Sequence, residues 1–309
     1  MSIVRLPWLN CVLLATLLSG CRTAPVTGRK QLSFMPESRE VAMGLSAYQD
    51  VVTKEPASTN QQYVALVNRV GQRIAAVSDR PDYRWEFRVL ASPTQNAFCL
   101  PGGKVAVYEG IIPICQTEAG LAVVMSHEIG HALARHGGER ISENYAVESG
   151  RLLVGAVTQS FDQKQQEMMQ KFYGVGSNYG YILPHSRTHE MEADHIGLIL
   201  MAKAGYDPRE APAFWQRFAA SHNGTQPPEW QSTHPNDEHR ARALAALLPQ
   251  AVQLYDAAPQ KIGVGEAIAV APPAAKGPAQ PFGTAANSVS AATGPVASPW
   301  APPIHQFQR

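Results

Sequence analysis

The amino-acid sequence predicts an α+β fold that is mostly helical and contains a small antiparallel sheet. Apolar residues recur with the period of a helix over several stretches, of which residues 60–78 are the clearest. Residues 83–89 alternate between apolar and polar side chains, as a half-buried strand does. Residues 96–100 and 104–108 flank Pro101-Gly102-Gly103, which is typical of a hairpin turn. We therefore expect about three strands inserted between helices.

The first two helices are expected at residues 37–54 and 60–78. In the second, Thr59 or Asn60 is the expected N-cap, because its side-chain oxygen can accept hydrogen bonds from the first turn. One apolar stripe runs along this helix and consists of Tyr63, Leu66, Val67, Val70, Ile74 and Val77. In the strand that follows, the apolar face consists of Tyr83, Trp85, Phe87 and Val89.

Four further helical regions follow the sheet. One is expected at residues 117–136, stopped by Gly137-Gly138 and buried, because nearly all of its positions are apolar. Another begins near Ser186 and has Gly205 just beyond its end. The last two expected helices lie around Phe214-Trp215-Phe218 and at residues 236–248.

Residues 1–20 have the features of a lipoprotein signal peptide. The stretch Leu6–Leu18 is apolar, but as a helix it would span only about 20 Å, short of the ~30 Å hydrocarbon core of a bilayer. Leu18-Ser19-Gly20-Cys21 is typical of a bacterial lipobox. We therefore expect a lipid on Cys21, attachment to a membrane of the cell envelope, and an extended tether over residues 21–36. Arg22 after the cysteine favours the outer membrane, on the side that faces the periplasm.

Composition limits the remaining possibilities. The formal net charge is +1, and no basic run is dense enough to follow a phosphate backbone, so nucleic acid is not an expected partner. Residues 258–309 are rich in Ala, Pro and Gly and are expected to be a disordered tail, which leaves residues 37–257 for one domain. Cys99 and Cys115 are expected to be either bridged or free. The oligomeric state is not indicated.

A metal-binding motif lies in the middle of the expected 117–136 helix. His127 and His131 are four residues apart and share one helical face, so both imidazoles can reach one tetrahedral metal ion. Glu128 points to the same side and is the expected general base for a water molecule. A buried cluster of this kind without an ion would be unfavourable. The pattern predicts one zinc ion per chain.

A catalytic zinc site needs a third protein ligand. The best candidate is Glu190, which shares a face with Asp194 on the helix that begins near Ser186. Spacing alone also allows Glu190 to be a solvated acid near the helix N-terminus. Glu192 falls on another side and competes only weakly. Asp194 is placed to accept a hydrogen bond from a ligand histidine, and Arg240 could hold that carboxylate ionised.

Together these motifs resemble the HtpX/CAAX-prenyl-protease family of zinc metallopeptidases. The resemblance rests on HEIGH within a helix, Glu190 and Asp194 on a later helix, and Thr233-His234-Pro235 followed by Arg240. The stretches 96–103 and 204–208 and the lipobox are similar to its soluble periplasmic branch. The resemblance covers about residues 21–250. The chain departs from the family in lacking membrane helices and C-terminal helical repeats, which argues against a prenyl-protein substrate.

The resemblance implies a zincin-like (gluzincin) fold with Glu190 as the third zinc ligand and with Asp194 and Arg240 behind a ligand histidine. It also implies an endopeptidase that hydrolyses unfolded or misassembled envelope proteins in protein quality control. His234 is expected either to occupy the fourth zinc position at rest or to stabilise the transition state. His136 is expected to be structural.

Peptidases of this kind bind an extended peptide against an edge strand. Asn96, Ala97 and Phe98 begin the expected edge strand, directly before the zinc helix. The glycines at 174, 176 and 180 form a loop ahead of the third ligand, either a lid or a plain connector.

Two other functions remain open. One is a chaperone or assembly factor for outer-membrane proteins whose zinc site is plugged, and the other is hydrolysis of a small amide. Glu128 argues against the first, and the expected edge strand argues against the second.

Overall fold

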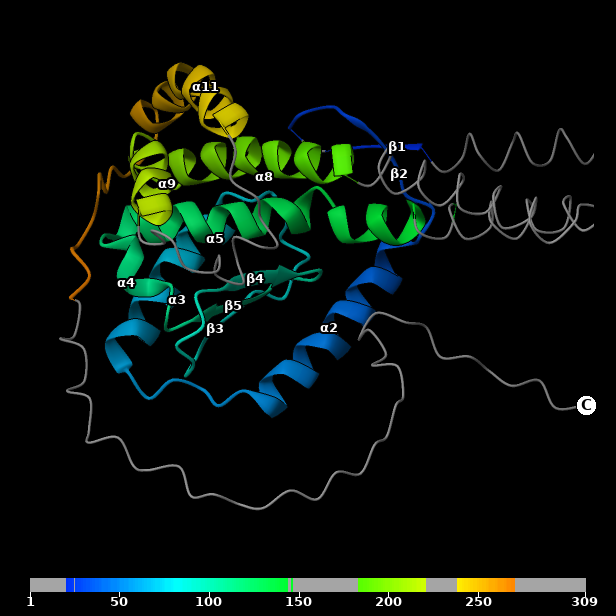
Figure 1. Cartoon of the computed structure of the whole chain (residues 1–309), viewed down its shortest axis with the longest axis horizontal. Coiled ribbons are helices and arrows are strands. Elements are labelled where there is room, and N and C mark those ends of the chain that lie inside the picture. The colour runs from blue at the N-terminus through cyan, green and yellow to red at the C-terminus, as the bar shows by residue number, and fades with distance from the viewer. Residues whose placement is uncertain (1–20, 25, 144–145, 147–182, 221–237, 270–309) are drawn as a thin grey trace, which may run out of the picture. The chain divides into compact units, whose positions relative to one another are not determined.

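The computed structural model describes residues 21–24, 26–143, 146, 183–220 and 238–269 (Figure 1). The two central helices, α5 (Glu118–Leu133) and α8 (Leu183–Lys203), lie side by side. The three-stranded sheet lies on the α5 side of this pair, and α11 (Glu238–Asp256) lies on the α8 side. The expected α+β class, mostly helical with a small sheet, is confirmed.

Helix α5 is buried on nearly every side because nearly all of its residues are apolar. The hydroxyl of Thr117 caps it by accepting a hydrogen bond from the Gly120 N–H at 3.0 Å. Gly137-Gly138 does not stop the helix, so that prediction is wrong. The break comes at Arg135, whose φ of +60° lies in the left-handed region, and a second helical segment continues over residues 136–143.

Two glycines allow α5 and α8 to approach closely. A Cβ atom on Gly130 would lie 2.9 Å from the Ala193 carbonyl oxygen, and one on Gly197 would lie 2.9 Å from the backbone nitrogen of His127. Any larger residue would meet backbone, which cannot move aside cheaply. Gly197 approaches α5 at Ser126 and His127, whereas Gly130 approaches α8 at Ala193. The contact that is later on α5 is thus earlier on α8, so the two helices run antiparallel.

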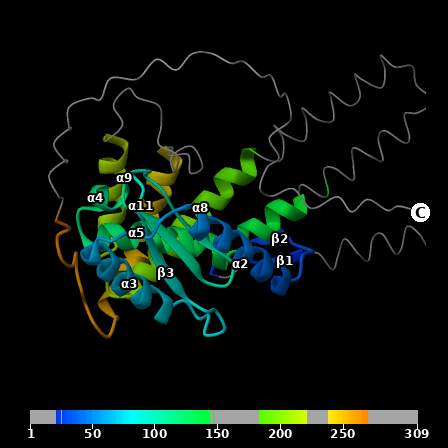
Figure 2. The same ribbon diagram turned by 90° about the horizontal axis from the view of Figure 1, so that it is seen from below.

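The sheet has the strand order β3-β5-β4, formed by β3 (Glu86–Leu90), β4 (Ala97–Leu100) and β5 (Lys104–Tyr108). The β4–β5 hairpin is antiparallel, as expected, but β3 runs parallel to β5. Alternation of side chains marks a strand without giving its direction, so this pairing was not predictable from the pattern. The sheet lies between α2 (Glu37–Lys54) and the α5–α8 pair (Figure 1), and Figure 2 looks along this stack from the α2 side.

The helices around this core agree closely with the sequence pattern. Helix α2 spans Glu37–Lys54 and α3 spans Gln61–Ala76, and the Asn60 side chain caps α3 by accepting from the N–H groups of Gln62 and Tyr63. Two helices lie at the N-terminal end of α5, α4 (Ile112–Cys115) and α9 (Glu210–Ala220). Helix α11 continues through Pro249, eight residues past the expected end at residue 248.

The N-terminal segment is not the extended tether that we expected. Strands β1 (Cys21–Thr23) and β2 (Lys30–Leu32) form an antiparallel hairpin in which Cys21 pairs with Leu32. Gln31 and Ser33 are buried. The prediction failed because Gly28, which the sequence pattern assigned to an unstructured linker, takes a left-handed φ of +71° in the connection between the two strands.

The beginning of the predicted tail is also ordered. Residues 258–269 return to the domain: Ala267 pairs with Thr117, Gly263 pairs with Tyr206, and Ile268 is buried. The domain therefore includes residues 258–269 instead of ending at residue 257. The signal peptide, the glycines at 174–180, His234 and the tail from residue 270 lie outside the described residues.

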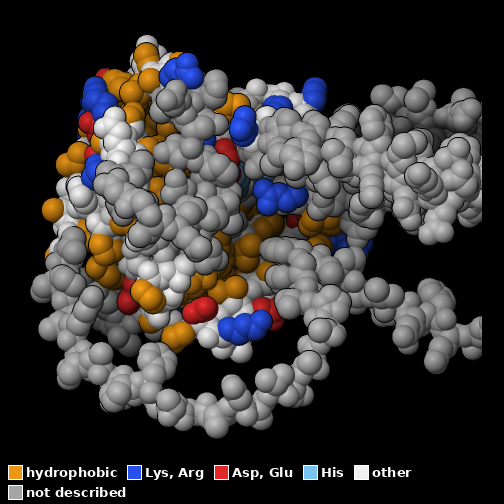
Figure 3. Space-filling model, in the orientation of Figure 1, with side chains coloured by type: hydrophobic (Ala, Val, Ile, Leu, Met, Phe, Trp, Pro, Cys, Tyr) orange, Lys and Arg blue, Asp and Glu red, His pale blue; other side chains and the backbone are white. Residues whose placement is uncertain are grey.

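Over the part of the chain that the structure describes, no helix combines the length and apolarity needed to cross a bilayer. On the face seen in Figure 3, the described Lys and Arg side chains are scattered among hydrophobic ones.

Candidate metal centre

The structure brings His127 and His131 of α5 together with Glu190 of α8. The two Nε2 atoms of the histidines are 3.1 Å apart. Nε2 of His127 lies 3.4 Å from one Glu190 oxygen, and Nε2 of His131 lies 3.3 Å from the other. Atoms that each lie about 2.0–2.1 Å from one tetrahedral ion are about 3.3 Å from one another. The three side chains therefore fit a single metal ion.

The surroundings of His127 also favour a cation. Burial opposes a positive charge on this side chain, but hydrogen bonds to Asp194 and Glu190 outweigh burial and raise the pKa of His127 to about 9. His131 has the opposite balance, because burial lowers its pKa well below the ordinary value. A neutral imidazole beside acidic groups is the form that binds a divalent metal.

Asp194 and Arg240 support His127 from behind. Nδ1 of His127 lies 3.0 Å from an Asp194 oxygen. The Arg240 guanidinium donates to both Asp194 oxygens at 2.8 and 2.9 Å and lies 3.0 Å from Glu190. Burial tends to raise the pKa of Asp194, but Arg240 and His127 together lower it, so this carboxylate stays ionised. The structure thus brings Asp194 and Arg240 to the site.

Glu128 is buried on α5, the helix that packs against the edge strand β4. Burial raises the pKa of the Cys99 thiol on β4, and the Glu128 carboxylate raises it further, so these two side chains are close. Strand β4, which begins at Ala97 and includes Phe98, is the edge of the described sheet and packs against α5. The Asn96 carbonyl accepts the first hydrogen bond of the hairpin, from Tyr108. The edge strand therefore lies beside the general-base candidate.

Four residues near His131 were missed by sequence reasoning as parts of the site. Nδ1 of His131 lies 2.8 Å from Nδ1 of His136, and Nε2 of His136 lies 3.0 Å from a Glu192 oxygen. Arg29 donates to that Glu192 oxygen at 2.7 Å, and the Thr27 hydroxyl donates to the other. The local sequence carries no signal for this group, because every contact of Glu192 joins segments more than 50 residues apart.

A neighbouring group consists of His136, Glu139 and His189, all buried. His189 lies 2.9 Å from a Glu139 oxygen, and Arg29 binds both Glu139 oxygens at 2.8 and 2.6 Å. Burial tends to raise the pKa of Glu139, but Arg29 and His189 lower it to about 2. Burial lowers the pKa of His136 to about 4 despite its contact with Glu192.

Cys99 and Cys115 are both free thiols, so the structure contains no bridge between them. Burial raises the pKa of each thiol. Neither is therefore in the reactive thiolate form at neutral pH.

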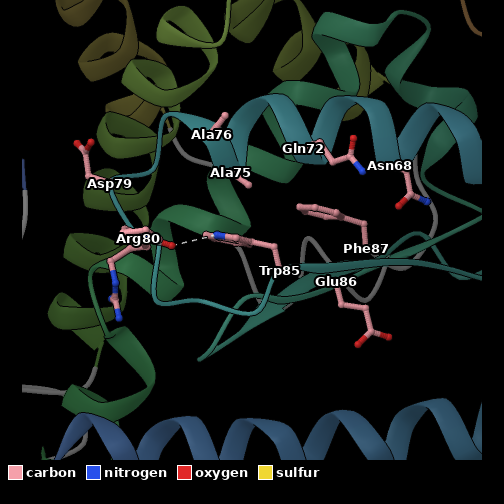
Figure 4. A pocket seen from close by; sticks show the side chains of 10 residues that line it. Asn68, Gln72, Ala75, Ala76, Asp79, Arg80, Trp85, Glu86 and Phe87 are labelled. Carbon is pink, nitrogen blue, oxygen red and sulfur yellow. Dashed lines mark hydrogen bonds between the residues drawn. The ribbon is translucent and has the colours of Figure 1, made fainter.

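The hollow drawn in Figure 4 lies between α3 and β3, apart from the metal centre. It has a volume of about 640 Å³ and is open to solvent. Trp85 and Phe87 stack along its floor, and the Trp85 indole donates to the Arg80 carbonyl at 3.3 Å. None of the candidate metal ligands His127, His131 and Glu190 lines this hollow, so it has no part in the metal site.

Two histidines one turn apart on a buried helix, a glutamate directly after the first, and a third acidic ligand on an antiparallel neighbour define a metalloprotease. The sequence model of Peptidase family M48 matches residues 61–248, more than half of the chain. The chain belongs to peptidase family M48.

Named relatives agree with this class. Mitochondrial metalloendopeptidase OMA1 of Schizosaccharomyces pombe is 38% identical over 231 residues, which cover 74% of this chain and 66% of the relative. Metalloendopeptidase OMA1, mitochondrial, of Bos taurus is 33% identical and covers 75% of this chain and 47% of the relative. A putative beta-barrel assembly-enhancing protease of Vibrio cholerae is 27% identical, with 70% and 45% covered. The chain thus spans about two thirds of the first relative and about half of the other two.

Proposed function

We propose that this chain is a zinc-dependent endopeptidase with one zinc ion per chain, held by His127, His131 and Glu190. The observation that carries the proposal is the convergence of these three side chains: the two Nε2 atoms lie 3.1 Å apart, and each lies 3.3–3.4 Å from a Glu190 oxygen. Nitrogen and carboxylate donors in this number suit zinc and leave a fourth position for catalysis.

Glu128 is the proposed general base. When bound, the metal would polarise the peptide carbonyl and lower the pKa of a water molecule. Glu128 takes a proton from the attacking water and passes it to the leaving amine. Asp194 holds His127 in the tautomer that presents Nε2 to the metal, and Arg240 keeps Asp194 ionised. His234 is proposed either to occupy the fourth zinc position at rest or to stabilise the transition state.

The substrate is proposed to be an extended polypeptide that adds a strand to β4. Asn96 and Phe98 take part in the β4–β5 ladder, so the alternation of an antiparallel pair turns the backbone groups of Ala97 and Cys99 toward the free edge. The backbone of a bound peptide would then run beside Glu128, which places its peptide bonds close to the candidate metal centre.

The proposed location is the cell envelope, with a lipid on Cys21 and attachment to the outer membrane on its periplasmic side. The lipobox supports this, and the Vibrio cholerae relative bears the name of a beta-barrel assembly-enhancing protease. Removal of unfolded or misassembled envelope proteins is the role we propose, in the periplasmic branch of the family that the sequence motifs resemble. The competing candidate is an assembly factor that binds without cleaving.

The test is degradation of an unfolded protein such as casein by the mature chain, with and without a zinc chelator, beside Glu128→Gln. We expect the variant to bind zinc normally and to lose activity by ~10²–10⁴-fold. A small amide serves as the comparison substrate. Full activity of Glu128→Gln would refute the mechanism, and zinc binding without any proteolysis would favour the assembly factor.

A further inference from the structure

We propose that Glu192 acts as a positioning residue for the zinc ligand His131, through His136, and that Arg29 of the N-terminal hairpin holds Glu192 in place. The proposal rests on the proposed function only in requiring that His131 binds a metal. It gives the second ligand histidine a support comparable to the one that Asp194 and Arg240 give the first.

Proton positions along the chain of contacts follow from the atoms involved. Nε2 of His131 faces His127 and Glu190, so its lone pair is the one that the metal takes. A neutral imidazole then carries its proton on Nδ1, which lies 2.8 Å from Nδ1 of His136. His131 is therefore the donor and His136 the acceptor.

His136 continues this series of hydrogen bonds toward Glu192. Because Nδ1 of His136 accepts, its proton is on Nε2, which donates to the Glu192 carboxylate at 3.0 Å. An ionised carboxylate only accepts hydrogen bonds, so the direction of every bond is determined. A fixed tautomer and ring orientation raise the basicity of a ligand histidine.

The end of the chain is held by the N-terminal hairpin. Glu192 is buried, and both of its oxygens are occupied: one accepts from Arg29 and His136, and the other from Thr27. Arg29 follows the turn between β1 and β2, directly before Lys30. The hairpin thus supplies a cation to the support of the metal centre, as Arg240 of α11 does on the other side.

The same side chains could in principle form a second metal site at His136, Glu139 and His189. Such a site would need a lone pair of His136, but one nitrogen accepts from His131 and the other carries the proton given to Glu192. Both oxygens of Glu139 accept from the Arg29 guanidinium, a positive charge that would repel a metal cation. The hydrogen-bonded chain therefore agrees with all the contacts, and the second ion does not.

Glu192→Gln and His136→Phe test the proposal, with Glu139→Gln as the matched control. Phe keeps the ring that stacks on His189 at 4.3 Å but cannot accept from His131. Glu139 shares Arg29 and a histidine partner with Glu192, yet makes no contact with a zinc ligand in the structure. Zinc dissociation constants are measured by chelator competition, together with the visible spectrum of the Co²⁺-substituted protein and the melting temperature.

We expect the zinc affinity to fall ~10–100-fold in Glu192→Gln, His136→Phe and Arg29→Ala, with an altered Co²⁺ spectrum. Glu139→Gln should keep the affinity within about threefold and keep the spectrum, even if its melting temperature falls. Equal losses of affinity in Glu139→Gln and Glu192→Gln would overturn the proposal and reduce Arg29 to an anchor of the hairpin. Two ions per chain, the second lost in His189→Ala, would also overturn it. Absence of zinc from the wild-type chain would instead refute the proposed function.

Discussion

The guanidinium carbon of Arg240 lies 4.3 Å from the ring centroid of Trp215, and the same indole lies edge-on to His127 at 6.1 Å. One face of the guanidinium thus rests on α9 while its N–H groups reach Asp194 and Glu190 on α8. A single side chain of α11 connects three helices behind one candidate metal ligand.

Arg240→Lys should weaken zinc binding by about tenfold or more, although the charge is kept. An ammonium group cannot bind both Asp194 oxygens in a planar fork or stack on Trp215 as a guanidinium does. The zinc dissociation constant is the measurement, and Arg242→Lys, an exposed position on the same helix, is the control. Equal affinities in the two variants would show that the fork geometry does not matter.

Gly197→Ala should destabilise the domain by about 1–3 kcal/mol, because the new methyl group would lie 2.9 Å from the backbone nitrogen of His127 and push α8 away from α5. Thermal unfolding monitored by circular dichroism gives the change. Gly137→Ala is the control, since nothing lies within 4 Å of its Cβ position and alanine favours the helical segment. A neutral effect at Gly197 would mean that the two helices separate without cost.

Glu139 should make the domain sensitive to acid. Its pKa is lowered to about 2 in the folded chain, so the ionised form stabilises the fold above the ordinary value near 4.5. This contribution is lost as the pH falls from about 5 toward 2, because the unfolded chain takes up the proton first. Glu139→Gln should reduce the slope of unfolding free energy against pH in that window by up to about 1.4 kcal/mol per pH unit. Parallel curves for both chains would contradict the assignment.

Peptide substrates in which one amide is replaced by an ester should distinguish strand addition from looser binding. An ester at the position that donates to the free edge of β4 removes one ladder hydrogen bond and should raise KM severalfold, while kcat changes little. Esters at alternate positions, which point away from β4, are the internal control. A uniform response along the peptide would exclude pairing with β4.

The two candidate ligand histidines could be found from the sequence because a helix repeats every 3.6 residues, so His127 and His131 must share a face wherever the helix lies. The N-cap of α3 and the end of α8 could be predicted for the same reason, because each depends only on residues next to it in the sequence. Glu192 could not be assigned in this way, since its partners His136 and Arg29 come from other segments. The break at Arg135 was hidden for a similar reason: the Arg135 guanidinium binds Glu40 at 2.5 Å, 95 residues away, across that turn.

The pairing of Cys21 with Leu32 has a consequence for reach. In an antiparallel pair the Cα atoms of opposite residues lie about 4.5–5.5 Å apart. A lipid on Cys21, as proposed, would join the bilayer to a hairpin that is already part of the folded domain, with no slack chain between. The catalytic domain could then not move far from the membrane surface into the envelope. It would cut only polypeptides that arrive within one domain's width of the lipid headgroups, which selects substrates by where they stall before any sequence preference applies.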